Sequence, residues 1–317
     1  MSAAGNTALE GRVAIVTGAG RGVGRAIAEE LAACGARVVV ADSGTSIGGD
    51  GADPSVAKET AAAIGANAIA WADSVASPGG ARRLVETARE AFDGVDIVVN
   101  NAAILRDAFI FKGDPADWEA VIRTNLSAAY YLLAAATPLL RENAKANRGG
   151  EPYDWGRVVN IVSTAGLYGN FGQSAYAAAK AGLVGLTRVA AMDLARAGIT
   201  ANAVAPFAAT RVTDIIQPAN DAQAAYKERA LKLSGSHVGR FVAYLASSDA
   251  QNVTGQIFGV RGREVFLFGQ ARPVARIVRE DADWDLPALA DAVSGEFTDS
   301  FTDLSTDLEA FNTEPYV

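Results

Sequence analysis

The fold is decided by Val13-Ala14-Ile15-Val16-Thr17-Gly18-Ala19-Gly20-Arg21-Gly22-Val23-Gly24, a stretch close to the start of the 317-residue chain. Its apolar residues predict a buried strand, and its glycines predict a tight turn that opens a helix. In such a turn the backbone N–H groups can approach a pyrophosphate at the helix N-terminus. An acid, Asp42, ends the next apolar run, where a carboxylate can accept hydrogen bonds from an adenosine ribose. The combination predicts a dinucleotide site.

Apolar, β-branched runs alternate with helix-length stretches through most of the chain. Strands are expected at residues 13–16, 38–41, 68–71, 97–100, 158–162, 201–204 and 256–260. Helices are expected between them, at residues 25–33, 80–92, 115–140 and 174–196. Strands that lack polar alternation are buried on both faces, which indicates a parallel, doubly wound sheet covered by helices. The predicted fold class is therefore α/β, with a Rossmann-type sheet of seven parallel strands.

The sequence predicts one domain over residues 1–264 and a C-terminal extension over residues 265–317. Residues 280–317 contain eleven acids and neither Lys nor Arg, a composition that is too acidic to build a core alone. Aromatic side chains, including Trp284, Phe301, Phe311 and Tyr316, recur among these acids. Because a purely solvating segment has few aromatics, we expect the extension to cover a protein surface, on its own subunit or on a neighbour. A solvated appendage is the alternative.

Composition and charge exclude several classes of protein. The net charge of −8 disfavours a nucleic-acid partner. The chain has one histidine, His237, and one cysteine, Cys34, so the familiar zinc clusters are absent and no metal is expected. No apolar run approaches the roughly 20 residues that span a bilayer, and residues 1–10 lack the pattern of a signal peptide. A cytoplasmic location is therefore expected.

Two charged residues near the expected dinucleotide site bear on NAD against NADP. A carboxylate at Asp42 would repel a 2′-phosphate by roughly 4 kcal/mol at 4 Å and an effective dielectric of about 20. Arg21 in the glycine-rich turn points the other way, because a guanidinium can meet a phosphate. Asp42 carries more weight, since a carboxylate at the strand end excludes the 2′-phosphate, whereas Arg21 merely attracts it. The expected cofactor is NAD.

Further polar residues stand at strand ends and on helices where they can reach the same cleft. Tyr176 and Lys180 are four apart on an expected helix, so their side chains share a face. Ser163 follows the fifth strand, and Asn100-Asn101-Ala102-Ala103 ends the fourth. Asn125 lies in the middle of an expected helix. Each residue alone has an ordinary structural explanation, but together they form a set in register with a cofactor site.

With these residues in place, the sequence resembles the short-chain dehydrogenase/reductase family over roughly residues 9–262. The usual family pattern has Gly where this chain has Ala103 and Phe207. Phe207 leaves the backbone path beside the nicotinamide in question. The resemblance implies cofactor contacts at Gly18, Arg21, Gly22, Val23, Gly24, Asp42, Asp73, Ser74, Val75, Asn101, Ala102, Tyr176, Lys180 and Pro206.

The resemblance also implies the catalytic roles. Tyr176 would take the alcohol proton in oxidation or return it in reduction. Its ordinary pKa is near 10, and we expect the Lys180 cation and the oxidised nicotinamide to lower it. Lys180 would also hold the nicotinamide ribose, and Ser163 would hydrogen-bond the reacting oxygen. Asn125 would fix a water that links Lys180 to solvent.

Within the family, the segments 40–44, 104–107 and 167–173 look like the (3R)-hydroxyacyl-CoA dehydrogenase unit of the D-specific multifunctional enzyme of β-oxidation. That resemblance implies a secondary-alcohol dehydrogenase in lipid metabolism, acting on a 3-hydroxyacyl-CoA or hydroxysteroid-type substrate. Two alternatives stay open: another small secondary alcohol (terpenoid, aromatic or sugar), or a non-catalytic NAD-binding sensor. Residues 207–233 are expected to form a mobile substrate lid.

Members of the family usually pair through the long helices that follow the fourth and fifth strands. In this chain those helices are expected at residues 115–140 and 174–196. The resemblance therefore implies a homodimer or homotetramer that binds a small-molecule hydroxy or keto substrate.

Overall fold

A computed structural model describes residues 7–150, 155–211, 213 and 220–317. Its strands form a single sheet in the order β3-β2-β1-β4-β5-β6-β7-β8. Strands β1 to β7 pair in parallel, as the sequence predicts, and β8 pairs with β7 in the antiparallel sense. The bounds are β1 Val13–Thr17, β2 Arg37–Ala41, β3 Ala68–Trp71, β4 Ile97–Asn100, β5 Arg157–Ile161, β6 Thr200–Phe207, β7 Ile257–Arg261 and β8 Glu264–Phe268.

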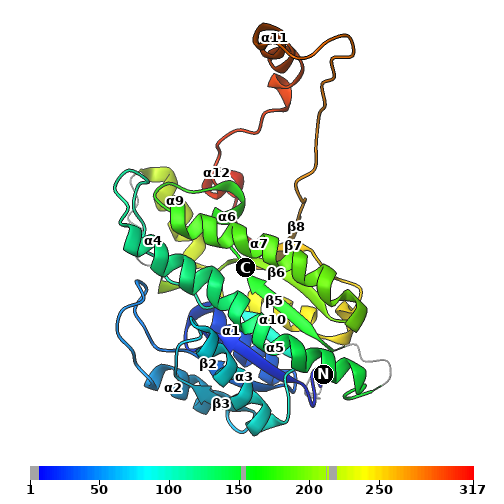
Figure 1. Cartoon of the computed structure of the whole chain (residues 1–317). Helices are drawn as coiled ribbons and strands as arrows, with labels where there is room; N and C mark the ends of the chain where they lie inside the picture. Colours follow the sequence, from blue (N-terminus) through cyan, green and yellow to red (C-terminus); the bar gives the residue numbers. More distant parts are fainter. Residues whose placement is uncertain (1–6, 151–154, 212, 214–219) are drawn as a thin grey trace.

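The sheet is buried on both faces because successive strand residues enter two different hydrophobic cores. Val38 and Val40 of β2 belong to one core, and Val39 between them belongs to the other. Helices α1 (Gly22–Ala33), α2 (Ser55–Ile64) and α10 (Ser236–Ala246) cover the first face. Helices α3 (Pro78–Phe92), α5 (Ala128–Lys145) and α7 (Ser174–Leu194) cover the second (Figure 1).

The chain order reverses at β1, which lies between β2 and β4. In doubly wound sheets a ligand crevice opens at this switch point, outside the carboxyl ends of the strands. The remaining short elements gather near that edge or beyond it. They are α4 Pro115–Ile122, α6 Ala165–Tyr168, α9 Asp221–Leu231, α11 Leu286–Glu296 and α12 Asp307–Ala310.

The helix expected at residues 115–140 differs from the prediction in one respect. A π-helical turn, Arg123–Ser127, separates α4 from α5, and α5 continues to Lys145. The wider turn centres on Asn125, whose buried side chain is clasped by the backbone of Ile104. Because a π-turn adds one residue to a helical turn, it re-aims side chains, and such turns are frequent at functional sites.

The expected count of seven strands is wrong by one. Val265-Phe266-Leu267-Phe268, assigned from the sequence to the extension, belongs to β8, so the sheet crosses the expected boundary at residue 264. Gly262 has φ +58° and occupies the first position of a two-residue turn between β7 and β8. Glycine at that position is typical of a hairpin, and this signal was present in the sequence.

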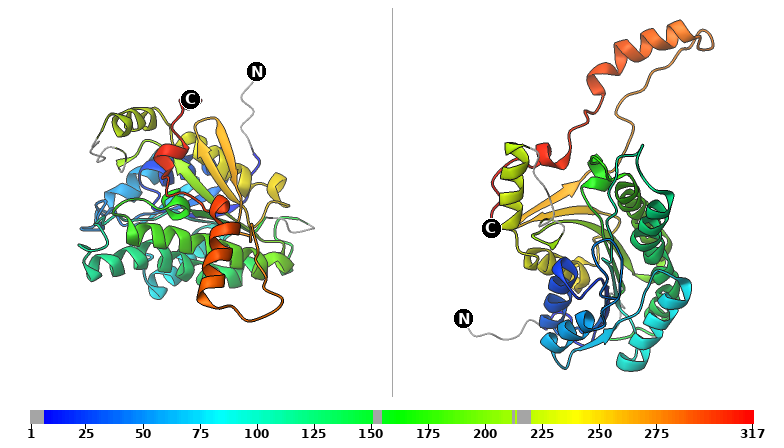
Figure 2. Two further views of the ribbon diagram at one scale, coloured as in Figure 1. Left: turned by 90° about the horizontal axis from the view of Figure 1, so that it is seen from above. Right: turned by 90° about the vertical axis from the view of Figure 1, so that its left-hand side faces the viewer.

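Beyond β8 the extension leaves the body and then returns to it. Helix α11 stands away from the sheet (Figures 1 and 2), and Leu286 and Leu304 are 82% and 94% exposed. Residues 307–316 come back over the carboxyl edge of the sheet, where Phe311 stacks 4.8 Å from Phe207. The expected contact with a protein surface is present only in this last segment, because Trp284 and Phe301, on which the expectation rested, are 40% and 63% exposed.

Candidate active site

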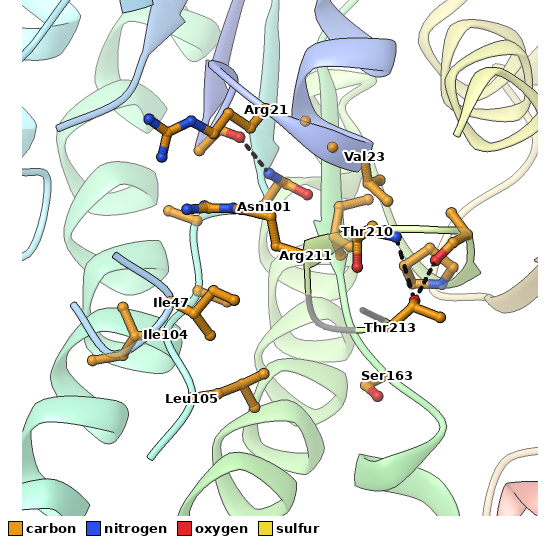
Figure 3. Close-up of a pocket in the computed structure, with 18 of the residues that line it drawn as sticks. Arg21, Val23, Ile47, Asn101, Ile104, Leu105, Ser163, Thr210, Arg211 and Thr213 are labelled. Atoms are coloured by element: carbon orange, nitrogen blue, oxygen red, sulfur yellow. Dashed lines mark hydrogen bonds between the residues drawn. The ribbon is translucent and has the colours of Figure 1, made fainter. Parts of the chain in front are cut away.

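A large pocket lies at the carboxyl ends of β1, β2, β4, β5 and β6. In Figure 3, Arg21 and Ser163 occupy opposite ends of it. Ile47, Ile104 and Leu105 lie along one side, and Thr210 and Thr213 along the other. The position is that of the switch-point crevice, so the fold alone explains why a ligand site forms here.

The glycine-rich turn is packed so closely that side chains do not fit. A Cβ on Gly18 would lie 2.8 Å from Cα of Ala102, and one on Gly24 would overlap the carbonyl oxygen of Gly18. The Asn101 amide ties the two strand ends together, because its Nδ2 donates to the carbonyls of Thr17 (2.9 Å) and Gly18 (3.0 Å). The start of α1 is thereby fixed facing the pocket, and its backbone N–H groups fit a pyrophosphate.

Asp42 follows β2 directly and supports the same turn. Its Oδ2 accepts from the Gly20 N–H at 2.9 Å and its Oδ1 from the Gly44 N–H at 2.7 Å. Each oxygen retains a second lone pair, so the carboxylate can still accept from a ribose hydroxyl. Arg211, which was not predicted from the sequence, lines the same pocket as Asp42. Burial lowers the pKa of Arg211, the charge of Arg21 lowers it further, and the charge of Asp42 raises it.

The expected segment Asp73, Ser74 and Val75 lines the pocket wall beyond β3. Asp73 is held by Arg83, whose Nη2 donates to Oδ2 at 2.5 Å. That hydrogen bond is the largest cause that lowers the pKa of Asp73. Asp73 is thus fixed as an anion, and its other oxygen accepts from the Ser74 N–H.

Ser163, Tyr176 and Lys180 meet at the other end of the pocket. Ser163 follows β5, and its hydroxyl lies close enough to the Tyr176 phenol to lower the pKa of that phenol. Lys180 lies one turn further along α7, with its Nζ 5.7 Å from the centre of the Tyr176 ring. Lys180 is 2% exposed, and its ammonium donates to the Ile161 carbonyl at 2.7 Å. The predicted one-face arrangement on α7 is what brings these groups together.

The pKa of Tyr176 moves in the direction opposite to that expected. Burial of the phenol raises it to about 12; the nearby Ser163 hydroxyl lowers it, and the charges of Asp107 and Asp307 raise it. Burial lowers the pKa of Lys180 to about 8, which still leaves it largely an ammonium at neutral pH. In this structure Tyr176 is therefore a phenol at neutral pH, the form that donates a proton.

Asn125 is buried beside the pocket rather than on its main wall. Its Oδ1 accepts from the Ile104 N–H at 2.8 Å and its Nδ2 donates to the Ile104 carbonyl at 2.9 Å. The side chain thus anchors the loop that follows β4. The water contact expected of Asn125 stays a prediction.

With this geometry in view, the comparisons with known proteins agree. The profile of the short chain dehydrogenase family matches residues 12–224. The chain belongs to that family of oxidoreductases. It is 41% identical to hydroxyacyl-CoA dehydrogenase ChsB1 of Mycobacterium tuberculosis, over 88% of this chain and 86% of that one. It is also 38% identical to peroxisomal multifunctional enzyme A of Dictyostelium discoideum, over 78% of this chain and 52% of the relative.

A solved structure gives the same picture. The crystal structure of a short chain dehydrogenase from Mycobacterium avium superposes with a TM-score of 0.74 at 37% identity. The match covers 91% of this chain and 97% of that one. The predicted family, fold class and relationship to the multifunctional enzyme are thereby confirmed.

In this short-chain dehydrogenase the two departures from the family pattern have different outcomes. Ala103 lines the pocket in the loop after β4. Phe207 is 7% exposed and packs its ring against Phe311 from the C-terminal segment. A large residue is accommodated at position 207 because the extension supplies its partner.

Several pocket residues escaped sequence reasoning. Tyr226 and Arg229 of α9 belong to the expected lid over residues 207–233, of which residues 212 and 214–219 lie outside the described part of the chain. Four others come from the extension: Asp307, Phe311, Thr313 and Pro315. No local pattern marks such residues, because only the return of the chain brings them to the cleft.

In the part of the chain that the structure describes, no group of three or more His, Cys, Asp or Glu side chains is placed to hold a metal ion. No helix among the described residues combines the length and the apolar character needed to cross a membrane. His237 lies in α10, where burial, followed by Arg240 and Arg263, lowers its pKa.

Proposed function

We propose that this chain is an NAD-dependent dehydrogenase that interconverts a secondary alcohol and a ketone. The observation that carries the proposal is that Ser163, Tyr176 and Lys180 line the same end of a pocket whose other end fits a dinucleotide, with Lys180 Nζ 5.7 Å from the centre of the Tyr176 ring. We further propose a cytoplasmic location, which a single buried cysteine suits.

The chain's own residues support a proton-transfer mechanism. A bound nicotinamide would supply or accept the hydride. Tyr176, a phenol at neutral pH, donates its proton to the ketone oxygen in reduction and is left as the phenolate; in oxidation that phenolate takes the alcohol proton. Ser163 positions both the phenol and the reacting oxygen. Lys180, buried and fixed by Ile161, holds the ribose side of the cofactor and places positive charge beside the phenol.

A 3-hydroxyacyl-CoA or hydroxysteroid-type substrate is the class we favour. The pocket near Ser163 is walled by apolar groups, among them Leu105, Phe207 and Phe311, which suits a greasy substrate. The relative ChsB1 is described as a hydroxyacyl-CoA dehydrogenase. Another small secondary alcohol is the second candidate. The intact set of Asn125, Ser163, Tyr176 and Lys180 argues against a non-catalytic NAD sensor.

The test is a screen for NADH formation by purified protein. It should include 3-hydroxyacyl-CoAs, hydroxysteroids, and terpenoid, aromatic and sugar secondary alcohols. The proposal expects turnover with at least one of the first two groups. Turnover confined to the last group would favour the second candidate, and NAD binding without any turnover would favour the sensor.

The cofactor prediction follows from the charges around Asp42. The wild-type protein should bind NAD more tightly than NADP, because the carboxylate repels a 2′-phosphate more than Arg21 and Arg211 attract it. Asp42→Ala should narrow the difference between the two affinities by about tenfold or more, which is about a third of the roughly 4 kcal/mol of a charge pair at 4 Å and an effective dielectric of about 20. Titration calorimetry with both nucleotides measures the two dissociation constants.

A matched control is Glu59→Ala, an exposed acid of α2 outside the pocket lining. It should leave the NAD/NADP ratio unchanged. A wild-type preference for NADP would mean that the two arginines dominate and that the assignment of NAD is wrong.

The oligomer prediction rests on the two long helices. Exposed apolar side chains stand on α5 (Tyr130, 56% exposed) and α7 (Val189 and Met192, 48% and 64%). We propose that a second copy of this chain covers them, to give a dimer or tetramer. Light scattering at micromolar concentration should give two or four times the chain mass of 32.7 kDa. A monomer mass would contradict it.

A further inference from the structure

The C-terminal segment, residues 307–316, forms part of the pocket wall beside the reacting groups. Asp307, Phe311, Thr313 and Pro315 of this segment all line the pocket that holds Ser163, Tyr176 and Lys180. Between β8 and this segment the chain runs out through α11 and back (Figure 2). A stretch that is remote in sequence therefore completes the site.

The segment is fixed to the sheet by Arg261, which ends β7. The guanidinium is 4% exposed and pairs with Glu264 at 2.8 Å. Its Nη1 donates to the carbonyls of Phe311 (2.9 Å) and Thr313 (3.2 Å), and its Nη2 donates to Thr313 Oγ1 at 2.8 Å. A buried, fully paired arginine holds its partners rigidly, because charge-assisted hydrogen bonds are the stronger ones.

Phe311 adds an apolar anchor. Its ring lies 4.8 Å from that of Phe207, 5.2 Å from Phe266 and 6.2 Å from Tyr168, centre to centre. The last two contacts are edge-on, an arrangement that aromatic rings favour. The wall is thus built from β6, β8, α6 and the C-terminal segment together.

Asp307 places a carboxylate in this wall. Its Oδ2 accepts from Thr164 Oγ1 at 2.7 Å and from the Tyr226 hydroxyl at 3.4 Å. Thr164 follows Ser163 directly, so the acid is held next to the reacting end of the pocket. The charges that act on the Tyr176 phenol are both acidic, Asp107 and Asp307.

The basic side chains near this segment bond to residues other than Asp307. Arg261 is paired with Glu264, and Arg229 Nη2 donates to Asn312 Oδ1 at 2.5 Å. Lys232 pairs with Glu314 at 2.8 Å. Among the described residues, Asp307 forms no ion pair with these cations, although Arg229 and Arg261 lie near enough to act on Tyr226 beside it.

We propose that residues 307–316 are a fixed wall of the substrate site and that Asp307 is a specificity-determining residue, which selects against a carboxylate next to the reacting carbon. This inference rests on the proposed function. A free 3-oxo acid would bring its own carboxylate toward Asp307, whereas an ester or thioester of the same acid is uncharged there. Rejection by a like charge is a recognised way to build specificity.

The test compares acetoacetate with methyl acetoacetate, which share the ketone and differ in the charge. Wild-type kcat/KM for NADH-dependent reduction should favour the ester by about 100-fold, and Asp307→Asn should shrink that preference by about tenfold. Deletion of residues 307–317 should shrink it as well. Calorimetry of both compounds on the enzyme–NADH complex measures the same preference without turnover.

Asp299→Asn is the matched control, an exposed acid of the extension that is remote from the pocket lining. It should keep the wild-type preference. If the enzyme reduces both compounds and neither variant alters their ratio, the inference is wrong and the proposed function stands. If calorimetry shows the preference and its loss in Asp307→Asn, but no ketone is reduced, the inference stands and the proposed function is wrong.

Discussion

Replacement of Tyr176 by Phe should lower turnover by at least ~100-fold, the usual loss when a positioned general acid or base is removed. The variant loses only the hydroxyl, so the ring keeps its place on α7 between Ser163 and Lys180. NAD binding should therefore stay close to that of the wild type. Steady-state kinetics on the best alcohol of the screen and calorimetry with NAD give the two measurements.

The control for this variant is Tyr244→Phe, at a 42% exposed tyrosine of α10 outside the pocket lining. It should change neither turnover nor NAD binding. Near-normal turnover in Tyr176→Phe would remove the phenol from the mechanism. A loss of turnover accompanied by a comparable loss of NAD affinity would mean that the hydroxyl supports the cofactor rather than the proton transfer.

Local sequence patterns predicted the parallel part of the fold well. Runs such as residues 38–41 are apolar at every position because both faces of a central parallel strand are buried. β8 escaped because it lies at the edge, where Val265 and Leu267 are 53% and 65% exposed. The two-residue turn at Gly262 pairs β8 with β7, and a strand pattern based on burial does not include that turn.

The cofactor end of the site was predictable for a different reason. Gly18, Gly24 and Asp42 belong to one strand–turn–helix unit and its neighbouring strand, so their spacing in the chain fixes their spacing in the pocket. Arg211 lies more than 160 residues from this unit. It reaches the pocket through the order of the strands, which local patterns do not record.

The substrate end was predicted least. Asp307 and Phe311 come from an acidic stretch whose composition suggested only that it would cover a surface. Their place beside Ser163 depends on Arg261 and on the aromatic cluster around Phe207. The electrostatics were also missed: burial raises the pKa of Tyr176, and a helix pattern that places Lys180 nearby carries no information about solvent.

Replacement of Lys180 by Met should lower turnover by at least ~100-fold and, unlike Tyr176→Phe, should also weaken NAD binding. Methionine fills much of the space of the lysine stem but lacks the ammonium that donates to Ile161 and faces the Tyr176 ring. The charge beside the phenol and the donor toward the ribose disappear together. Kinetics and calorimetry separate the two losses.

The same variant has a stability signature that a surface lysine would not give. Burial lowers the pKa of Lys180 from 10.5 to about 8, so the unfolded chain binds more protons than the folded one between these values. Wild-type stability should therefore rise with pH through this window, by about 2 kcal/mol between pH 7 and 9.5 from this group alone. Tyr176, with its raised pKa, acts in the opposite sense only above pH 10.

Urea unfolding of the wild type and Lys180→Met at both pH values isolates that contribution, because all other titrating groups are common to both proteins. The unfolding free energy of the wild type should increase relative to that of Lys180→Met as the pH rises. Lys58→Met, at an exposed lysine of α2, should show no such shift. A pH-independent difference between wild type and Lys180→Met would mean that the ammonium is solvated, and that its charge is not held beside Tyr176 by burial.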